Sequence, residues 1–126
     1  MYLTTKEVLD LKQEVQKDLD DFNYRGKKHV YVIQGEERIT LLYVVELLNK
    51  ILQMLHKGNY IKDELLGALK EQDWIRYSFS SNSLWKEDKL RDRLQIKSKK
   101  AKVSDMLWKQ AEYLEQASWY IITRLD

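Results

Sequence analysis

The 126-residue sequence contains no cysteine and no proline, and only four glycines. Without cysteine there is no disulfide and no thiolate metal site, which suits a reducing compartment, so we expect a cytoplasmic protein. Turns between strands usually need proline and glycine, and their scarcity favours helices joined by short connections. Glu46, Asn49 and Lys50 interrupt the longest apolar stretch too early for a membrane span, and we therefore expect a soluble protein.

The length suits a single helical domain over residues 1–126, and 44% apolar with 33% charged residues is typical of a folded chain. The net charge of +2 is unevenly distributed. Residues 1–22 hold three lysines and six acidic residues, whereas residues 86–102 hold eight cations and three acidic residues. Such a molecule can close its acidic region on its basic one, pair with a second copy of the chain, or present one charged region to another partner.

Apolar residues recur at three- and four-residue steps from Arg38 to His56 and predict a helix over about residues 36–57. Other apolar side chains fill most of its opposite side, so this helix should be buried at the centre with neighbours on two or more sides. The side chains expected to form its main face are Leu41, Val44, Val45, Leu48, Ile51, Leu52 and Leu55.

The remaining chain predicts three or four further helices around this centre, giving a mostly α fold of four to five helices. The first begins with a capping box of Thr4 and Glu7 and should end at Gly26. Asn59 and Ser104 are expected to cap the helices that follow them, and a charged helix should begin at Ser83 and run to about residue 97. The core face expected for the last helix is Leu107, Ala111, Leu114, Ser118, Ile121 and Leu125.

Two short segments have the character of strands. Residues 29–33 are rich in β-branched and aromatic side chains, and residues 75–80 alternate between apolar and polar ones. The two could pair into a small two-stranded β ribbon supported by the helices. Residues 34–36 could instead turn the chain into a hairpin with 38–42, although Glu36 and Glu37 better suit the first turn of a helix.

Catalytic motifs are missing from the sequence. There is no HExxH pair, no glycine-rich phosphate loop and no strand-turn-helix nucleophile motif. His29 and His56 lie in no metal-ligand spacing with acidic residues or with each other. The sequence therefore predicts no catalytic residue, no cofactor and no metal site, and we expect a protein that is not an enzyme.

The segment from residue 76 to residue 102 combines aromatic rings with cations. Nucleic-acid binding uses both, because cations contact phosphates and rings stack on bases. Three acidic residues interrupt the cations, and the near-neutral total charge favours the alternative of a solvated helix braced by internal ion pairs. The candidate binding residues in this segment are Tyr77, Phe79, Trp85, Lys89, Arg91, Arg93 and Lys97.

Four tryptophans and eight tyrosines are many for a chain of this size. Tryptophan, tyrosine and arginine concentrate at binding hot spots, although aromatic residues also pack the edge of a small core with their polar tips in water. Trp108 and Trp119 lie three helical turns apart on the last helix. They would form a face for docking or self-association.

Two hypotheses follow from these patterns. The first is a non-enzymatic helical module that docks on a larger protein and modulates or inhibits it, a profile shared by small inhibitors, immunity proteins and phage accessory proteins. The alternative is a nucleic-acid-binding regulator that uses residues 76–102. A steep dependence of binding on salt would distinguish the second from the first.

Overall fold

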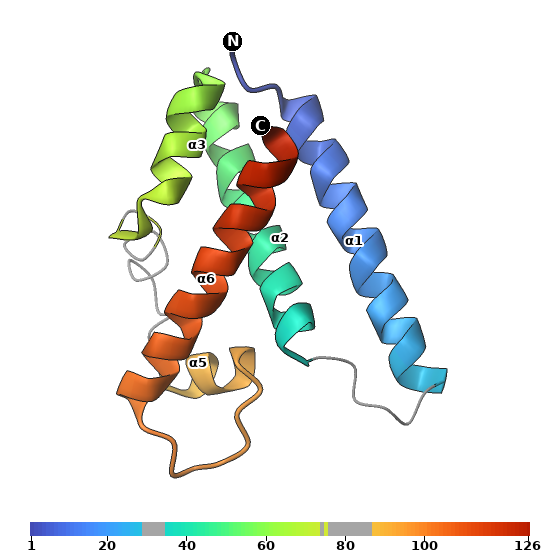
Figure 1. Cartoon of the computed structure of the whole chain (residues 1–126), viewed down its shortest axis with the longest axis vertical. Coiled ribbons are helices and arrows are strands. Elements are labelled where there is room, and N and C mark those ends of the chain that lie inside the picture. Colours follow the sequence, from blue (N-terminus) through green and yellow to red (C-terminus); the bar gives the residue numbers. More distant parts are fainter. Residues whose placement is uncertain (29–34, 74, 76–86) are drawn as a thin grey trace.

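The computed structural model describes residues 1–28, 35–73, 75 and 87–126, with the backbone alone for 22–28, 35–36 and 87–89 (Figure 1). No strand occurs within these ranges, and the expected mostly α fold is confirmed. The proposed β ribbon lies outside the described residues except for Ile75, which is helical and fully buried. The helices are α1 (Thr5–Lys28), α2 (Gly35–Lys57), α3 (Lys62–Lys70), α5 (Glu87–Arg93) and α6 (Val103–Leu125).

Helix α2 is the centre of the bundle, as its apolar circumference predicts. It packs against α1 and against α6, and α3 and α5 make their main contacts with α6 (Figure 1). The expected main face of α2 is partly wrong, because Val45, Leu52 and Leu55 are only half-buried. Because α2 packs against both α1 and α6, its buried residues span a different and wider arc than the single face predicted. Its buried side chains are Ile39, Leu41, Tyr43, Val44, Leu47, Leu48 and Ile51.

By length and composition, α2 is also the one helix in the described ranges that could cross a membrane. A core helix of a soluble protein meets the same criteria. The middle of α2 is packed between two other helices, and its buried side chains lie between Ile39 and Ile51.

The capping box at the start of α1 is confirmed. Glu7 N–H donates to Thr4 Oγ1 at 3.2 Å, and Thr4 N–H donates back to Glu7 Oε2 at 3.0 Å. Lys62 Nζ lies 3.2 Å from Glu7 Oε1 and so joins α3 to α1. The predicted end of α1 is wrong, because the helix continues through Gly26 to Lys28. A glycine inside a helix weakens it but does not stop it unless the next residues leave the helical path.

The predicted caps at Asn59 and Ser104 are also wrong. Helix α3 begins after Ile61 and α6 after Lys102, and neither receives a side-chain cap. Ile61 lies in an antiparallel bridge with Tyr2, in which Leu3 N–H donates to the carbonyl of residue 60 at 2.9 Å. Backbone pairing with the chain terminus, rather than a local polar side chain, therefore sets the start of α3.

Candidate functional site

An exposed stripe on α6 is the first candidate surface. Trp108 is 71% exposed and Trp119 is 48% exposed. With Glu112 and Glu115, both also exposed, they share one helical face, which we name the tryptophan ridge. The two indoles lie about 16 Å apart along the helix axis, at a rise of about 1.5 Å per residue.

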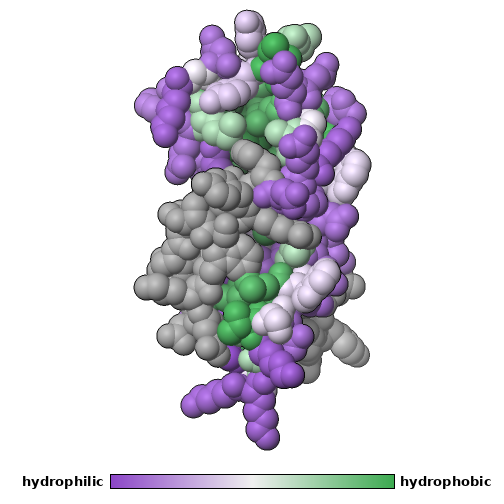
Figure 2. Space-filling model, turned by 90° about the vertical axis from the view of Figure 1, so that its left-hand side faces the viewer, coloured by the Kyte–Doolittle hydropathy of each residue, from purple (hydrophilic) through white to green (hydrophobic). Residues whose placement is uncertain are grey.

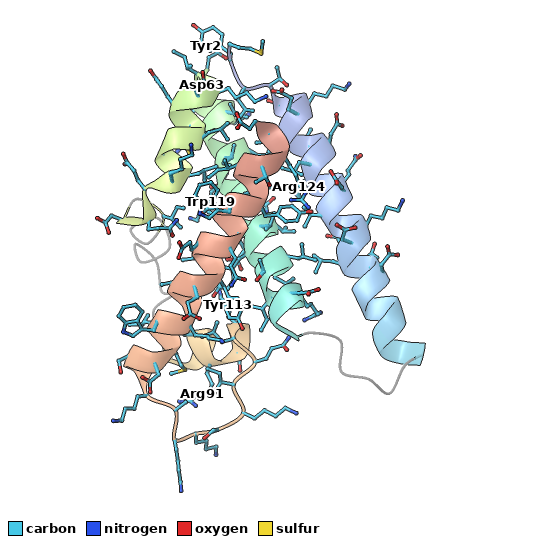
Figure 3. All side chains as sticks on the ribbon, viewed as in Figure 1. Tyr2, Asp63, Arg91, Tyr113, Trp119 and Arg124 are labelled. Atoms are coloured by element: carbon cyan, nitrogen blue, oxygen red, sulfur yellow. The ribbon has the colours of Figure 1, made fainter. Side chains whose placement is uncertain are left out.

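The tryptophan ridge is rigidly mounted. The side of α6 away from the ridge is buried against its neighbours, with Leu114 and Ile121 fully enclosed. Lys70 Nζ lies 6.0 Å from the centroid of the Trp119 ring, within the range of a cation–π contact from α3. Figure 3 shows Trp119 on the side of α6 that faces α3. The ridge is therefore presented by a packed helix and not by a mobile loop.

Part of the expected core face of α6 is wrong. Leu107 and Ala111 are only half-buried, whereas Gln110 and Tyr113 are buried. Helices α2, α3 and α5 all contact α6, so its buried arc is wider than one apolar stripe and includes polar side chains. Its members are Met106, Gln110, Tyr113, Leu114, Ala117, Ser118, Ile121, Ile122 and Leu125.

Gln110 and Tyr113 belong to a buried polar cluster that joins α2 to α6. Tyr43 Oη donates a hydrogen bond to Gln110 Oε1 at 2.5 Å, and the Tyr43 and Tyr113 rings stack with centroids 6.1 Å apart. Burial raises the pKa of Tyr43 well above its usual range, which keeps the hydroxyl protonated as a donor. The amide nitrogen of Gln110 is buried without a hydrogen-bond partner.

Arg93 connects α5 to this cluster. Its guanidinium lies 5.6 Å from the centroid of the Tyr43 ring, and its Nη1 is 2.8 Å from Glu46 Oε2. Burial raises the pKa of Glu46, while the adjacent Arg93 opposes that shift by stabilising the carboxylate. We define the polar cluster as Tyr43, Glu46, Arg93, Gln110 and Tyr113. It positions α5 and therefore the loop that follows α5.

Helix α5 ends at Arg93, earlier than predicted, in a Schellman motif. Gln95 adopts a left-handed backbone conformation with φ of 56°. Ile96 N–H donates to the carbonyl of Arg91 at 2.9 Å, and Gln95 N–H donates to that of Asp92 at 3.0 Å. Leu90 is fully buried, so the short helix is anchored on its inner face. The left-handed residue ends the helix and starts the loop toward α6.

We name residues 95–102 the basic loop. Arg91 Nη1 donates to the carbonyl of Ser98, and its Nη2 donates to the carbonyl of Ala101 at 3.3 Å. Lys100 N–H donates to Ser98 Oγ at 3.3 Å. The exposed cations of the loop are Lys97, Lys99, Lys100 and Lys102.

The structure divides the residues that the sequence suggested for partner binding. It places Trp108 and Trp119 together on an exposed face, and Lys97 in the basic loop. Arg91 and Arg93 instead bind groups of the chain itself: Arg91 donates to a backbone carbonyl of the basic loop, and Arg93 pairs with Glu46. The remaining candidates lie outside the described residues or have no described side chain, and they are Tyr77, Phe79, Trp85 and Lys89.

Two features escaped sequence reasoning. The order of the basic loop depends on Arg91, whose role shows only when α5 and the loop are folded together. The polar cluster had a sequence signal, since Met106, Gln110 and Tyr113 follow helical steps of four and three residues. The stripe through Leu107 and Ala111 was expected to face the core instead.

A groove of about 520 Å³ lies between α1, α2 and α5. Leu19, Leu42 and Val45 supply apolar lining, while two arginines and two carboxylates lie around them. Its volume is in the range of small-molecule sites, but neither sign of charge dominates. The groove therefore indicates no particular class of ligand. Figure 2 shows another face, that of α3, where hydrophilic side chains cover most of the described surface.

In the part of the chain that the structure describes, no three histidine, cysteine or acidic side chains are grouped to hold a metal ion. The chain matches no protein-family model, no curated protein and no solved structure. The described surfaces themselves are therefore the basis for a functional proposal.

Proposed function

We propose that this protein is a non-enzymatic binding module that docks on a larger protein through the tryptophan ridge and modulates or inhibits it. The observation that supports this proposal is the exposure of Trp108 and Trp119 on one face of a helix whose other side is buried. Tryptophan is among the residues that contribute most binding energy at protein interfaces. Burying both indoles would contribute several kcal/mol at about 25 cal/mol per Å² of apolar area.

The rigid mounting of the ridge favours docking without a folding cost. Because α6 is already ordered by its contacts with α2 and α3, association does not have to order the helix first. The cation–π contact with Lys70 favours one position of the Trp119 side chain before any partner binds. A pre-organised aromatic face retains more of its gross binding energy as affinity.

The charges of the ridge favour a different protein over a second copy. A pairing of two ridges in register, parallel or antiparallel, would place Glu112 and Glu115 against the glutamates of the other copy. Opposed like charges destabilise such a pair. The partner that fits has two apolar pockets about 16 Å apart, from the helical rise, with a cationic side chain between them.

The test is capture from the native cell with the double variant Trp108→Ser/Trp119→Ser. We expect the variant to lose the partner that the wild-type chain retains, while its circular dichroism and Tm stay close to wild type because both side chains are exposed. Leu9→Ser is the matched control, since Leu9 is 43% exposed on α1, away from the ridge. Equal capture by wild type and the tryptophan variant would refute docking through this ridge, and light scattering on the purified chain would detect self-association.

A further inference from the structure

The basic loop is a second surface, and no carboxylate of the described residues neutralises its charges. From residue 94 to residue 104 the sequence contains four lysines and no acidic residue. All four lysines are exposed, and none of them forms an ion pair with a described carboxylate. A cluster of four unneutralised cations on one short loop creates a positive potential that attracts anions.

Hydrogen bonds from the Arg91 side chain stabilise the conformation of the loop. Its guanidinium bridges the carbonyls of Ser98 and Ala101, and the Schellman motif fixes the exit from α5. Figure 3 shows Arg91 between α5 and the loop that follows it. The arginine therefore shapes the loop, while lysines alone make up its exposed cations.

We propose that the basic loop binds the phosphate backbone of nucleic acid without sequence preference. Lysine is depleted in protein–protein interfaces, where arginine is enriched, so a surface of lysines alone fits phosphates better than a protein. Lysine ammonium groups act as point charges on phosphates, and contacts to phosphates carry no sequence information. Ile96 and Ala101 are half-buried against the core, and the exposed tip from Lys97 to Lys100 offers no apolar side chain to a membrane.

The number of lysines predicts the salt dependence. Four phosphate contacts on double-stranded DNA give a slope of about −3.6 in a plot of log affinity against log salt concentration. Raising the salt from about 50 mM to about 200 mM should then weaken binding roughly 150-fold. This slope is a property of the loop alone and does not depend on the tryptophan ridge.

The test is fluorescence anisotropy of a short labelled DNA duplex of random sequence, titrated with the full chain at several salt concentrations. For Lys99→Gln/Lys100→Gln we expect a slope of about −1.8 and an affinity at least tenfold lower at about 100 mM salt. The matched control is Lys6→Gln/Lys17→Gln, which removes two exposed lysines from α1 and should leave the slope unchanged. Trp108→Ser/Trp119→Ser should bind the duplex as wild type does, which separates this inference from the proposed docking function.

Arg91→Lys tests the role of Arg91 as a positioning residue. It keeps the charge but cannot bridge two carbonyls with a planar fork, so we expect a several-fold lower affinity with the same slope. An unchanged affinity would refute that role. Absence of binding at about 50 mM salt, or equal losses in the two lysine variants, would overturn the proposal for the loop. Preferential binding to phosphatidylserine vesicles would overturn it in favour of a membrane surface.

Discussion

The two ends of the bundle are stabilised in different ways. At the end that carries both termini and α3 (Figure 1), most of the buried side chains are apolar, and the polar contacts of Thr4, Glu7 and Lys62 lie at or near the surface. At the other end, where α5 packs, the polar cluster is partly buried between helices. Apolar packing is non-directional and tolerates small rearrangements, whereas a buried polar group needs a specific partner. The second end is therefore more specific in geometry, and the basic loop is mounted there.

The largest effect should come from a cavity at the terminal end. Ile121 is fully buried on α6, and Ile121→Ala should lower the free energy of unfolding by about 2–5 kcal/mol. Urea denaturation measures the loss, and Ile121→Val, which removes a single methyl group, should cost only about 0.5–1.5 kcal/mol. Equal losses for the two variants would show that this end is not close-packed.

An intermediate effect should follow from Tyr43→Phe at the other end. The variant keeps the ring but leaves Gln110 Oε1 without its donor in a buried site, which should cost about 1–3 kcal/mol. Tyr43→Phe/Gln110→Leu removes both partners and should recover most of that loss, because neither polar atom of the Tyr43–Gln110 bond remains. Thermal unfolding of the single and double variants forms a double-mutant cycle. Additive losses would contradict a specific bond between the two side chains.

The smallest effect should be a pH dependence at the start of α1. The N–H of Thr4, and then Lys62, lower the pKa of Glu7 below its ordinary value of 4.5. The stabilising contribution of the Glu7 carboxylate is therefore complete above that value and is lost as the pH falls through the lowered pKa. The difference in Tm between wild type and Glu7→Gln should be constant near neutral pH and shrink in acid.

Asp10→Asn on the same helix is the control for this measurement, because Asp10 is exposed and lies outside the capping box. A gap between wild type and Glu7→Gln that stays unchanged in strong acid would contradict the role of the carboxylate. Together the three measurements compare the two ends of the bundle. The cavity and the surface cap test the end with the termini, and the buried hydrogen bond tests the end with α5.

Some elements could be predicted because their causes are local. The steps of three and four residues locate α2, and the Thr4–Glu7 pair closes within one turn, so neither depends on distant parts of the chain. The exposure of Trp108 and Trp119 follows from the same periodicity, which places them away from the apolar stripes of α6. In the candidate site, the tryptophan ridge was therefore within reach of sequence reasoning.

Other features depend on which helices meet. Gln110 is buried because α2 brings Tyr43 to it, and Arg93 turns inward because Glu46 and the Tyr43 ring lie beside it. The start of α3 is set by the backbone bridge between Ile61 and Tyr2. The conformation of the basic loop is set by the hydrogen bonds that Arg91 donates to it.

Helices around an apolar centre, and the side chains that share each helical face, can be derived from the order of the residues alone. Which of those faces are covered, and which arginines bind groups within the chain, depends on how the helices pack. Periodicity specifies directions around a single helix axis, whereas burial and hydrogen bonding depend on neighbours that are distant in the chain.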